Sequence, residues 1–183
     1  MKTLFIKYKS VIKFILTFLV VYIVLSVGYK FYLEFSEGSR FYPDYFTHLV
    51  GQQSNDLLNT FGYDSQMLPH PDEPSLKLIL ENVYVARIIE GCNGISVIIL
   101  FVSFIFAFSG KLKTTLLYVL SGSVLVYVVN VLRIVVLAIG IYQFPEWSEF
   151  LHSVVFPGII YGVVFLLWVF WVNRFSKLNK KDV

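Results

Sequence analysis

Charged residues are scarce in this chain. Only 15% of its 183 residues are charged, whereas 57% are hydrophobic. A soluble domain of this length could not bury so large an apolar share, which excludes an ordinary water-soluble globular protein. Cysteine occurs once, as Cys92, so an intrachain disulfide is excluded as well. With one cysteine and three scattered histidines, no metal site has recognisable ligand spacing, and no metal or other cofactor is expected.

Long apolar runs are abundant instead. Each of four runs is long enough to cross the roughly 30 Å hydrocarbon layer of a bilayer. They predict an all-α integral membrane protein with four transmembrane helices, organised as a single membrane domain over residues 1–183. The expected spans lie at about 11–31, 91–108, 114–144 and 152–172.

Two of these runs need interpretation. The first could be a signal peptide, but its apolar core is long and no small-residue cleavage site follows, so a retained helix is predicted. The third run, Thr114 to Phe144, would measure about 46 Å as one helix at 1.5 Å per residue. It must therefore tilt, bend or protrude from the bilayer.

The distribution of charge predicts the orientation. In a four-span arrangement, ten of the fifteen basic residues fall on one side and eleven of the twelve acidic residues on the other. Basic residues concentrate in cytoplasmic connections. Both termini are therefore expected in the cytoplasm, with the connections 33–90 and 143–151 outside a cytoplasmic (inner) membrane. The lipid bilayer is an expected partner, and nucleic acid is not.

The outer connection 33–90 is long enough to have structure of its own. Residues 43–61 are predicted to form a helix, because a proline starts the segment and Gly62 follows its end. Residues 68–74 form a turn-rich break with three prolines. Two β-rich runs, 76–80 and 83–89, then flank two residues, which predicts a hairpin that leads to Cys92.

Three residues with possible chemistry lie near the outer ends of the last three spans. Cys92 follows Glu90-Gly91, Arg133 lies inside the third run, and His152 starts the fourth. A cation near mid-membrane is costly and usually faces a partner or a wet cavity. The alternative for Arg133 is snorkelling of its guanidinium to the lipid headgroups.

Cys92 also has two interpretations. Buried free cysteines are often simple apolar fillers. However, Gly91 and Gly94 flank Cys92, and Asn93 can cap the start of the following helix. A helix N-terminus and a nearby arginine both favour the thiolate, which is the nucleophilic form of cysteine.

His152 alone would be an ordinary interfacial histidine. Beside a cysteine it is the usual general base, and the acid for the leaving group. A helix N-terminus disfavours imidazolium, so a neutral histidine fits best unless Glu146 or Glu149 compensates.

These motifs resemble the exosortase/archaeosortase family. The resemblance rests on Gly91-Cys92-Asn93-Gly94, Asn130-x-x-Arg133 and His152, covers about residues 84–171, and is closest to the short exosortase F type. Members are membrane-embedded, sortase-like cysteine enzymes thought to cut C-terminal sorting tails, each made of a short motif, a transmembrane helix and a basic cluster. The resemblance implies catalytic roles for Cys92, Arg133 and His152, supported by Asn93, Gly94 and Asn130. Family members usually have Ser or Ala where this chain has Asn93.

The residues and the resemblance together lead us to expect a cysteine transpeptidase or protease. The resemblance implies that its substrates are membrane-tethered proteins that carry a C-terminal transmembrane sorting tail. Cys92 would form a thioester, His152 would carry the proton, and Arg133 would stabilise the thiolate or the oxyanion. The alternative is a non-enzymatic scaffold or assembly factor of an export system. A transporter is a weaker third hypothesis, since its repeated halves are not found.

Overall fold

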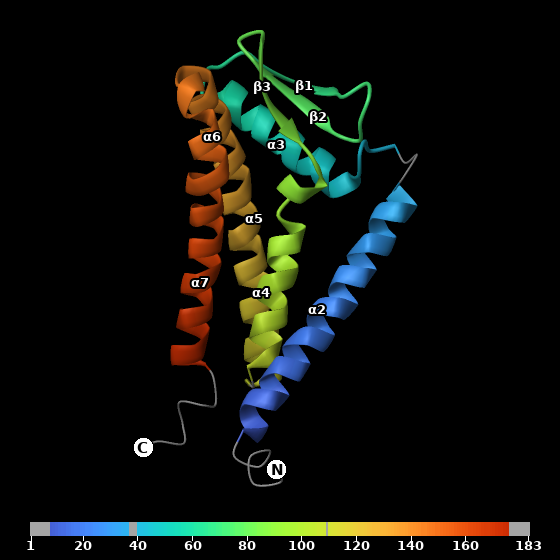
Figure 1. Ribbon diagram of the computed structural model, residues 1–183, viewed down its shortest axis with the longest axis vertical. Coiled ribbons are helices and arrows are strands. Elements are labelled where there is room, and N and C mark those ends of the chain that lie inside the picture. Colours follow the sequence, from blue (N-terminus) through green and yellow to red (C-terminus); the bar gives the residue numbers. More distant parts are fainter. Residues whose placement is uncertain (1–7, 37–39, 109, 176–183) are drawn as a thin grey trace.

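Three helical segments are long and apolar enough to cross a membrane. They are α2 (Lys9–Ser36), α5 (Leu112–Gln143) and the segment Pro145–Arg174, which is mostly α7 (Phe156–Arg174). The computed structural model describes residues 8–36, 40–108 and 110–175. In Figure 1 these helices run along the molecule, and a cap of α3 and three strands lies at one end. The chain is a multi-pass membrane protein.

The second expected span is shorter than the sequence predicted. It forms α4 (Ile95–Ala107), whose 13 residues measure about 20 Å, less than the roughly 30 Å of hydrocarbon. Its start is delayed because Glu90–Cys92 form a 3₁₀ turn (η1) and Gly94 adopts a φ of 81°. The predicted count of four full-length spans is therefore not confirmed. The described residues provide three spanning-length helical segments and this shorter apolar helix.

The third expected span is one unbroken helix of 32 residues. The C-terminal half of α5 packs against α3 and the strands of the cap. This contact forms one apolar cluster between the helix and the cap, with buried members Val131, Ile134, Val135 and Ala138 from α5 and Val50, Leu58, Leu76, Leu78, Leu80, Val85 and Ile88 from the cap.

Helix α3 (Tyr45–Thr60) agrees with the helix predicted over residues 43–61. Its N-terminus is capped by Asp44, whose carboxylate accepts hydrogen bonds from the backbone N–H groups of Phe46 and Thr47. Gly62 follows the helix with a φ of 91°, a left-handed conformation that glycine adopts at little cost.

The cap sheet is antiparallel, in the order β1 (Ser65–Pro69), β2 (Leu76–Leu80), β3 (Val83–Ile88). The predicted hairpin is present as β2 and β3. Glu81 and Asn82 have φ values of 51° and 63°, as a tight two-residue hairpin turn requires. β1 was not predicted, because its end overlaps the proline-rich break; Pro69 is tolerated there since β1 is an edge strand.

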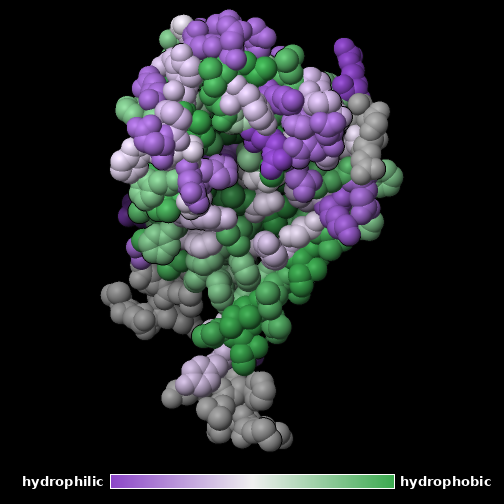
Figure 2. Space-filling model, turned by 45° about the horizontal axis from the view of Figure 1, so that its top comes forward, coloured by the Kyte–Doolittle hydropathy of each residue, from purple (hydrophilic) through white to green (hydrophobic). Residues whose placement is uncertain are grey.

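A second apolar cluster holds the helices together away from the cap. It joins α4, α5 and α7 through six buried side chains: Phe101, Ile105, Val126, Ile160, Val164 and Trp171. Figure 2 shows hydrophilic side chains gathered over the cap and hydrophobic ones along the helices below it. The start of α2 and the end of α7 lie together at the end of the molecule opposite the cap (Figure 1).

The last part of the chain enters α7 through a series of tight turns. Pro145–Trp147 form a 3₁₀ turn (η2), Ser148–Phe150 a short α-helical turn (α6), and Leu151–Val155 a π-helical turn (η3). The fourth span was predicted to begin at His152, and this residue lies in the π-helical turn.

Candidate active site

Cys92, Arg133 and His152 line the same cavity, which has a volume of about 280 Å³. The cavity lies where the cap meets α5, and its other walls come from residues 85–89 and from Ile134, Leu137 and Ile141. The structure thus brings together the three side chains that the sequence singled out from three separate segments. Their catalytic roles remain predictions.

The backbone of Cys92 is held from two directions. Its N–H donates a hydrogen bond to the carbonyl oxygen of Ile89 at 2.8 Å, which closes the 3₁₀ turn. Its carbonyl oxygen accepts a hydrogen bond from Asn130 Nδ2, also at 2.8 Å. The Cys92 side chain is partly exposed. The turn is therefore fixed while the thiol stays accessible from the cavity.

Gly94 allows the turn to approach α5 closely. Its φ of 81° lies in the left-handed region, and a Cβ atom placed on it would lie 3.1 Å from the Asn130 side chain. Both facts favour glycine at this position. The predicted supporting residues Gly94 and Asn130 are thus in mutual contact next to Cys92.

Asn93 is completely buried and connects three segments. Its Oδ1 accepts a hydrogen bond at 2.9 Å from the N–H of Ile95, the first residue of α4, although the N-cap position of that helix is Gly94 rather than Asn93. Its Nδ2 donates to the hydroxyl oxygens of Tyr29 at 2.7 Å and Thr47 at 3.1 Å. The turn that carries Cys92 is thereby tied to α2 and to α3.

Arg133 faces this cavity from α5 and is partly buried. Among the described residues, its Nε has no hydrogen-bond partner and no carboxylate forms an ion pair with it. A buried N–H group without a partner is costly, so a group that enters the cavity and accepts this hydrogen bond would be stabilised.

His152 reaches the cavity from the π-helical turn and is exposed to solvent. Turns of this kind are frequent at functional sites. Glu146 and Glu149, which the sequence offered as compensating carboxylates, are also exposed. In the part of the chain that the structure describes, neither forms an ion pair with His152.

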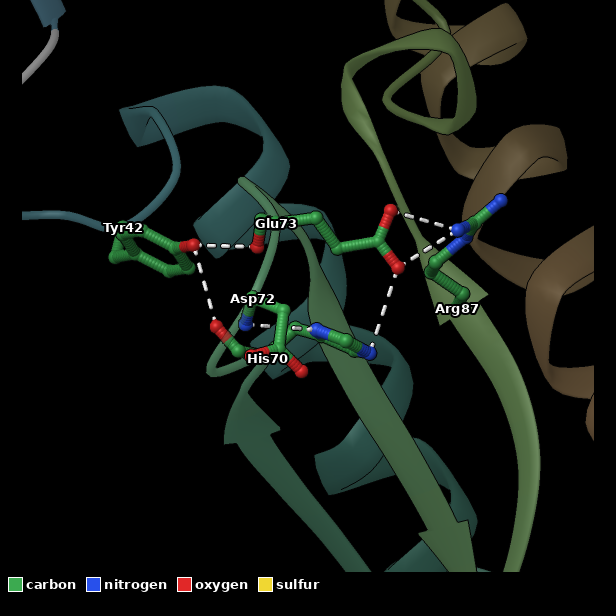
Figure 3. A network of polar contacts seen from close by, with 5 residues as sticks. All are labelled: Tyr42, His70, Asp72, Glu73 and Arg87. Carbon is green, nitrogen blue, oxygen red and sulfur yellow. Dashed lines mark hydrogen bonds and ion pairs between the residues drawn. The ribbon is translucent and has the colours of Figure 1, made fainter.

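A fourth polar residue in the cavity, Arg87, was missed by the sequence analysis. It projects from β3, and its Nη1 donates to both carboxylate oxygens of Glu73 at 2.7 Å (Figure 3). The only sequence signal was that Arg87 is the one basic residue in the apolar run 83–89. The pairing lowers the pKa of the Glu73 carboxyl and raises the pKa of Arg87, mainly through this hydrogen bond, so both groups carry charge at neutral pH.

Further contacts in Figure 3 hold Glu73 in place. His70 Nε2 lies 3.4 Å from a Glu73 carboxylate oxygen, and His70 Nδ1 accepts a hydrogen bond from the backbone N–H of Asp72. The hydroxyl of Tyr42 donates to the backbone carbonyl oxygens of His70 and Glu73. The loop between β1 and β2 therefore supports Arg87 at the edge of the cavity.

Within the described residues, no group of three or more Cys, His, Asp or Glu side chains is arranged to hold a metal ion.

The family described as transmembrane exosortase (Exosortase_EpsH) matches residues 5–171. This range includes α2, α3, β1 and β2, which the resemblance of residues 84–171 did not reach. No curated protein and no solved structure matches the chain.

Proposed function

The chain belongs to the transmembrane exosortase family, and on this premise we propose that it is a membrane-embedded, sortase-like cysteine transpeptidase or protease. Its substrates would be exported proteins that are still tethered to the membrane by a C-terminal sorting tail. The observation that carries the proposal is the shared cavity of Cys92, Arg133 and His152.

In the proposed reaction the Cys92 thiolate attacks a peptide carbonyl carbon of the substrate. His152 accepts the thiol proton and later donates it to the nitrogen of the leaving peptide. The C–N bond breaks, and the acyl group remains on Cys92 as a thioester. Water or an amine then attacks the thioester carbonyl and releases the thiol, giving hydrolysis or transpeptidation respectively.

Arg133 would act on charge that develops during this reaction. Its unpaired Nε–H and its positive charge face the cavity that holds the thiol. A donor aimed at an oxyanion in a water-poor site typically contributes about 3 to 4 kcal/mol to transition-state stabilisation. We assign Arg133 to the tetrahedral oxyanion or to the thiolate that precedes it.

We place both termini in the cytoplasm and the cavity at the outer face of the cytoplasmic membrane. Support comes from the basic residues at the end of the molecule opposite the cap, such as Lys9, Lys13, Lys111, Lys113 and Arg174. Basic residues mark the cytoplasmic side of membrane proteins. The cap carries most of the described carboxylates and would lie outside.

The test is replacement of Cys92 by Ala or by Ser in cells. We expect exported proteins with an apolar, basic tail to keep that tail in both variants, as measured by mass spectrometry of membrane fractions. Ser121→Ala is a matched control, because the Ser121 hydroxyl bonds only to carbonyl oxygens of its own helix. Unchanged tail removal at normal protein abundance would refute the enzyme and favour a scaffold or assembly factor.

A further inference from the structure

Strand β3 is an edge strand whose outer side has no backbone partner. β2 pairs with one side of it, and the sheet ends there. Among the described residues, the backbone of Val83–Ile88 makes no hydrogen bond outside the sheet. The outer edge of such a strand presents a row of N–H and C=O groups that can pair with another extended chain.

The cavity follows this edge rather than one face of the sheet. Three consecutive residues of β3, Ala86, Arg87 and Ile88, line it, together with Val85 at a bulge of the strand and Ile89 just beyond its end. Successive side chains of a strand point to opposite faces, so a cavity on one face would be lined by alternate residues only. A run of three neighbouring strand residues is the pattern of a groove along the edge, with α5 as its opposite wall.

The groove ends at the nucleophile. β3 ends at Ile88, and the 3₁₀ turn that carries Cys92 begins at Glu90. A chain paired with β3 advances about 3.3 Å per residue, so it reaches the level of Cys92 within a few residues.

The charges of the groove also suit a peptide backbone. Two guanidinium groups, Arg87 and Arg133, line it, and among the described lining residues there is no carboxylate. Glu73 holds Arg87 through one nitrogen, Nη1. Peptide carbonyl oxygens carry partial negative charge and complement these donors.

We propose that the substrate segment around the scissile bond binds as an extended strand along the free edge of β3 and presents its carbonyl group to Cys92. The proposal rests on the proposed function and adds the conformation in which the substrate is recognised. In strand addition the main-chain hydrogen bonds supply affinity, and pockets for alternate side chains supply specificity. The recognised segment must therefore be unfolded, and the cap sheet becomes four-stranded when substrate is bound.

The experiment uses photocrosslinking in the full-length Cys92→Ala variant in its own membranes. A short diazirine side chain replaces Arg87 or Ile89, two exposed cavity residues that lie two positions apart. The probes are the exported proteins that keep their tails in Cys92→Ala cells. We expect crosslinks from both positions, with the crosslinked substrate residue shifted by two. Gln66, exposed on the opposite edge strand β1, is the matched control and should give none.

A second measurement needs no substitution in β3. In the Cys92→Ala variant bound to an uncleaved tail-bearing protein, the amides of Val83–Ile88 should exchange hydrogen more slowly than in the unbound variant. The amides of Ser65, Gln66, Met67 and Leu68 on β1 should not change. Equal hydrogen-exchange rates of the β3 amides in the bound and unbound variant would overturn strand addition. So would crosslinks from the two positions that reach the same substrate residue.

The experiments distinguish a failure of the proposed function from a failure of strand addition at β3. If Cys92→Ala cells still remove the tails, the proposed function is wrong and strand addition falls with it. If those cells accumulate uncleaved proteins but β3 shows neither shifted crosslinks nor protection, the function stands and only this inference is refuted.

Discussion

Asn130 donates a hydrogen bond of 2.8 Å from its Nδ2 to the carbonyl oxygen of Cys92. Asn130 is buried in α5, three residues before Arg133, so the same turn of helix that presents the guanidinium also holds the backbone of Cys92. The position of the thiol relative to the guanidinium is therefore set by one rigid element rather than by a flexible loop.

Replacing Asn130 by Asp should slow tail removal by about tenfold or more while the protein still accumulates. The shape is kept, but a carboxylate cannot donate to the Cys92 carbonyl oxygen and repels it, and a buried acceptor left without a donor costs about 1 to 3 kcal/mol. The rate is measured by pulse labelling of a tail-bearing protein. A variant that processes at the normal rate would show that this hydrogen bond does not position the nucleophile.

Gly94→Ala should lower the free energy of unfolding by about 1 to 3 kcal/mol, because an alanine is strained at the left-handed φ of 81° and its Cβ crowds Asn130. Thermal denaturation in detergent measures the effect. Gly158→Ala is the control, since Gly158 has no atoms within 4 Å of an added Cβ and no positive φ. Equal free energies of unfolding for Gly94→Ala and Gly158→Ala would contradict the prediction that alanine is strained at position 94.

Arg133→Lys should reduce tail removal strongly, and Arg133→Met by about 100- to 1,000-fold, if the planar guanidinium stabilises the oxyanion. Arg40→Lys, at an exposed position of the cap, should have no effect and serves as the control. Rates are compared at equal membrane abundance. Full activity of Arg133→Lys would exclude a role that depends on guanidinium geometry.

The ion pair of Glu73 and Arg87 predicts a loss of stability in acid. Because the pKa of Glu73 is lower in the folded protein than its ordinary value of 4.5, the pair contributes stability above that value. The contribution is lost as the pH falls through the lowered pKa. Melting temperatures of the wild type and of Glu73→Gln, measured from pH 7 to pH 3, should therefore converge at low pH. A constant difference across this range would contradict the prediction.

The local elements could be predicted because their signals are local. The helix α3 was predicted from a proline at the start of its segment and Gly62 after its end, and the hairpin from the two residues between the β-rich runs. The late start of α4 could not be predicted in this way, because it depends on the left-handed backbone of Gly94. In that conformation Gly94 packs closely against the side chain of Asn130, a residue far away in the sequence.

The three candidate residues were found through topology, since each was expected near the same end of its span. Arg87 was not found, because its place in the cavity depends on how the hairpin packs against α5. A strand residue carries no sequence signal of the helix that faces it. The free edge of β3 could not be predicted from the sequence either, because it depends on the order of the strands in the sheet.

The shortness of α4 has a consequence for the surrounding lipid. A helix of about 20 Å beside neighbours of spanning length leaves the turn of Cys92 sunk below the level at which a full span would end. Hydrophobic mismatch at this point is relieved by local thinning of the bilayer or by water that enters beside the turn. The exposure of the Cys92 thiol to water should therefore depend on the thickness of the host membrane, and a thicker bilayer should lower that exposure.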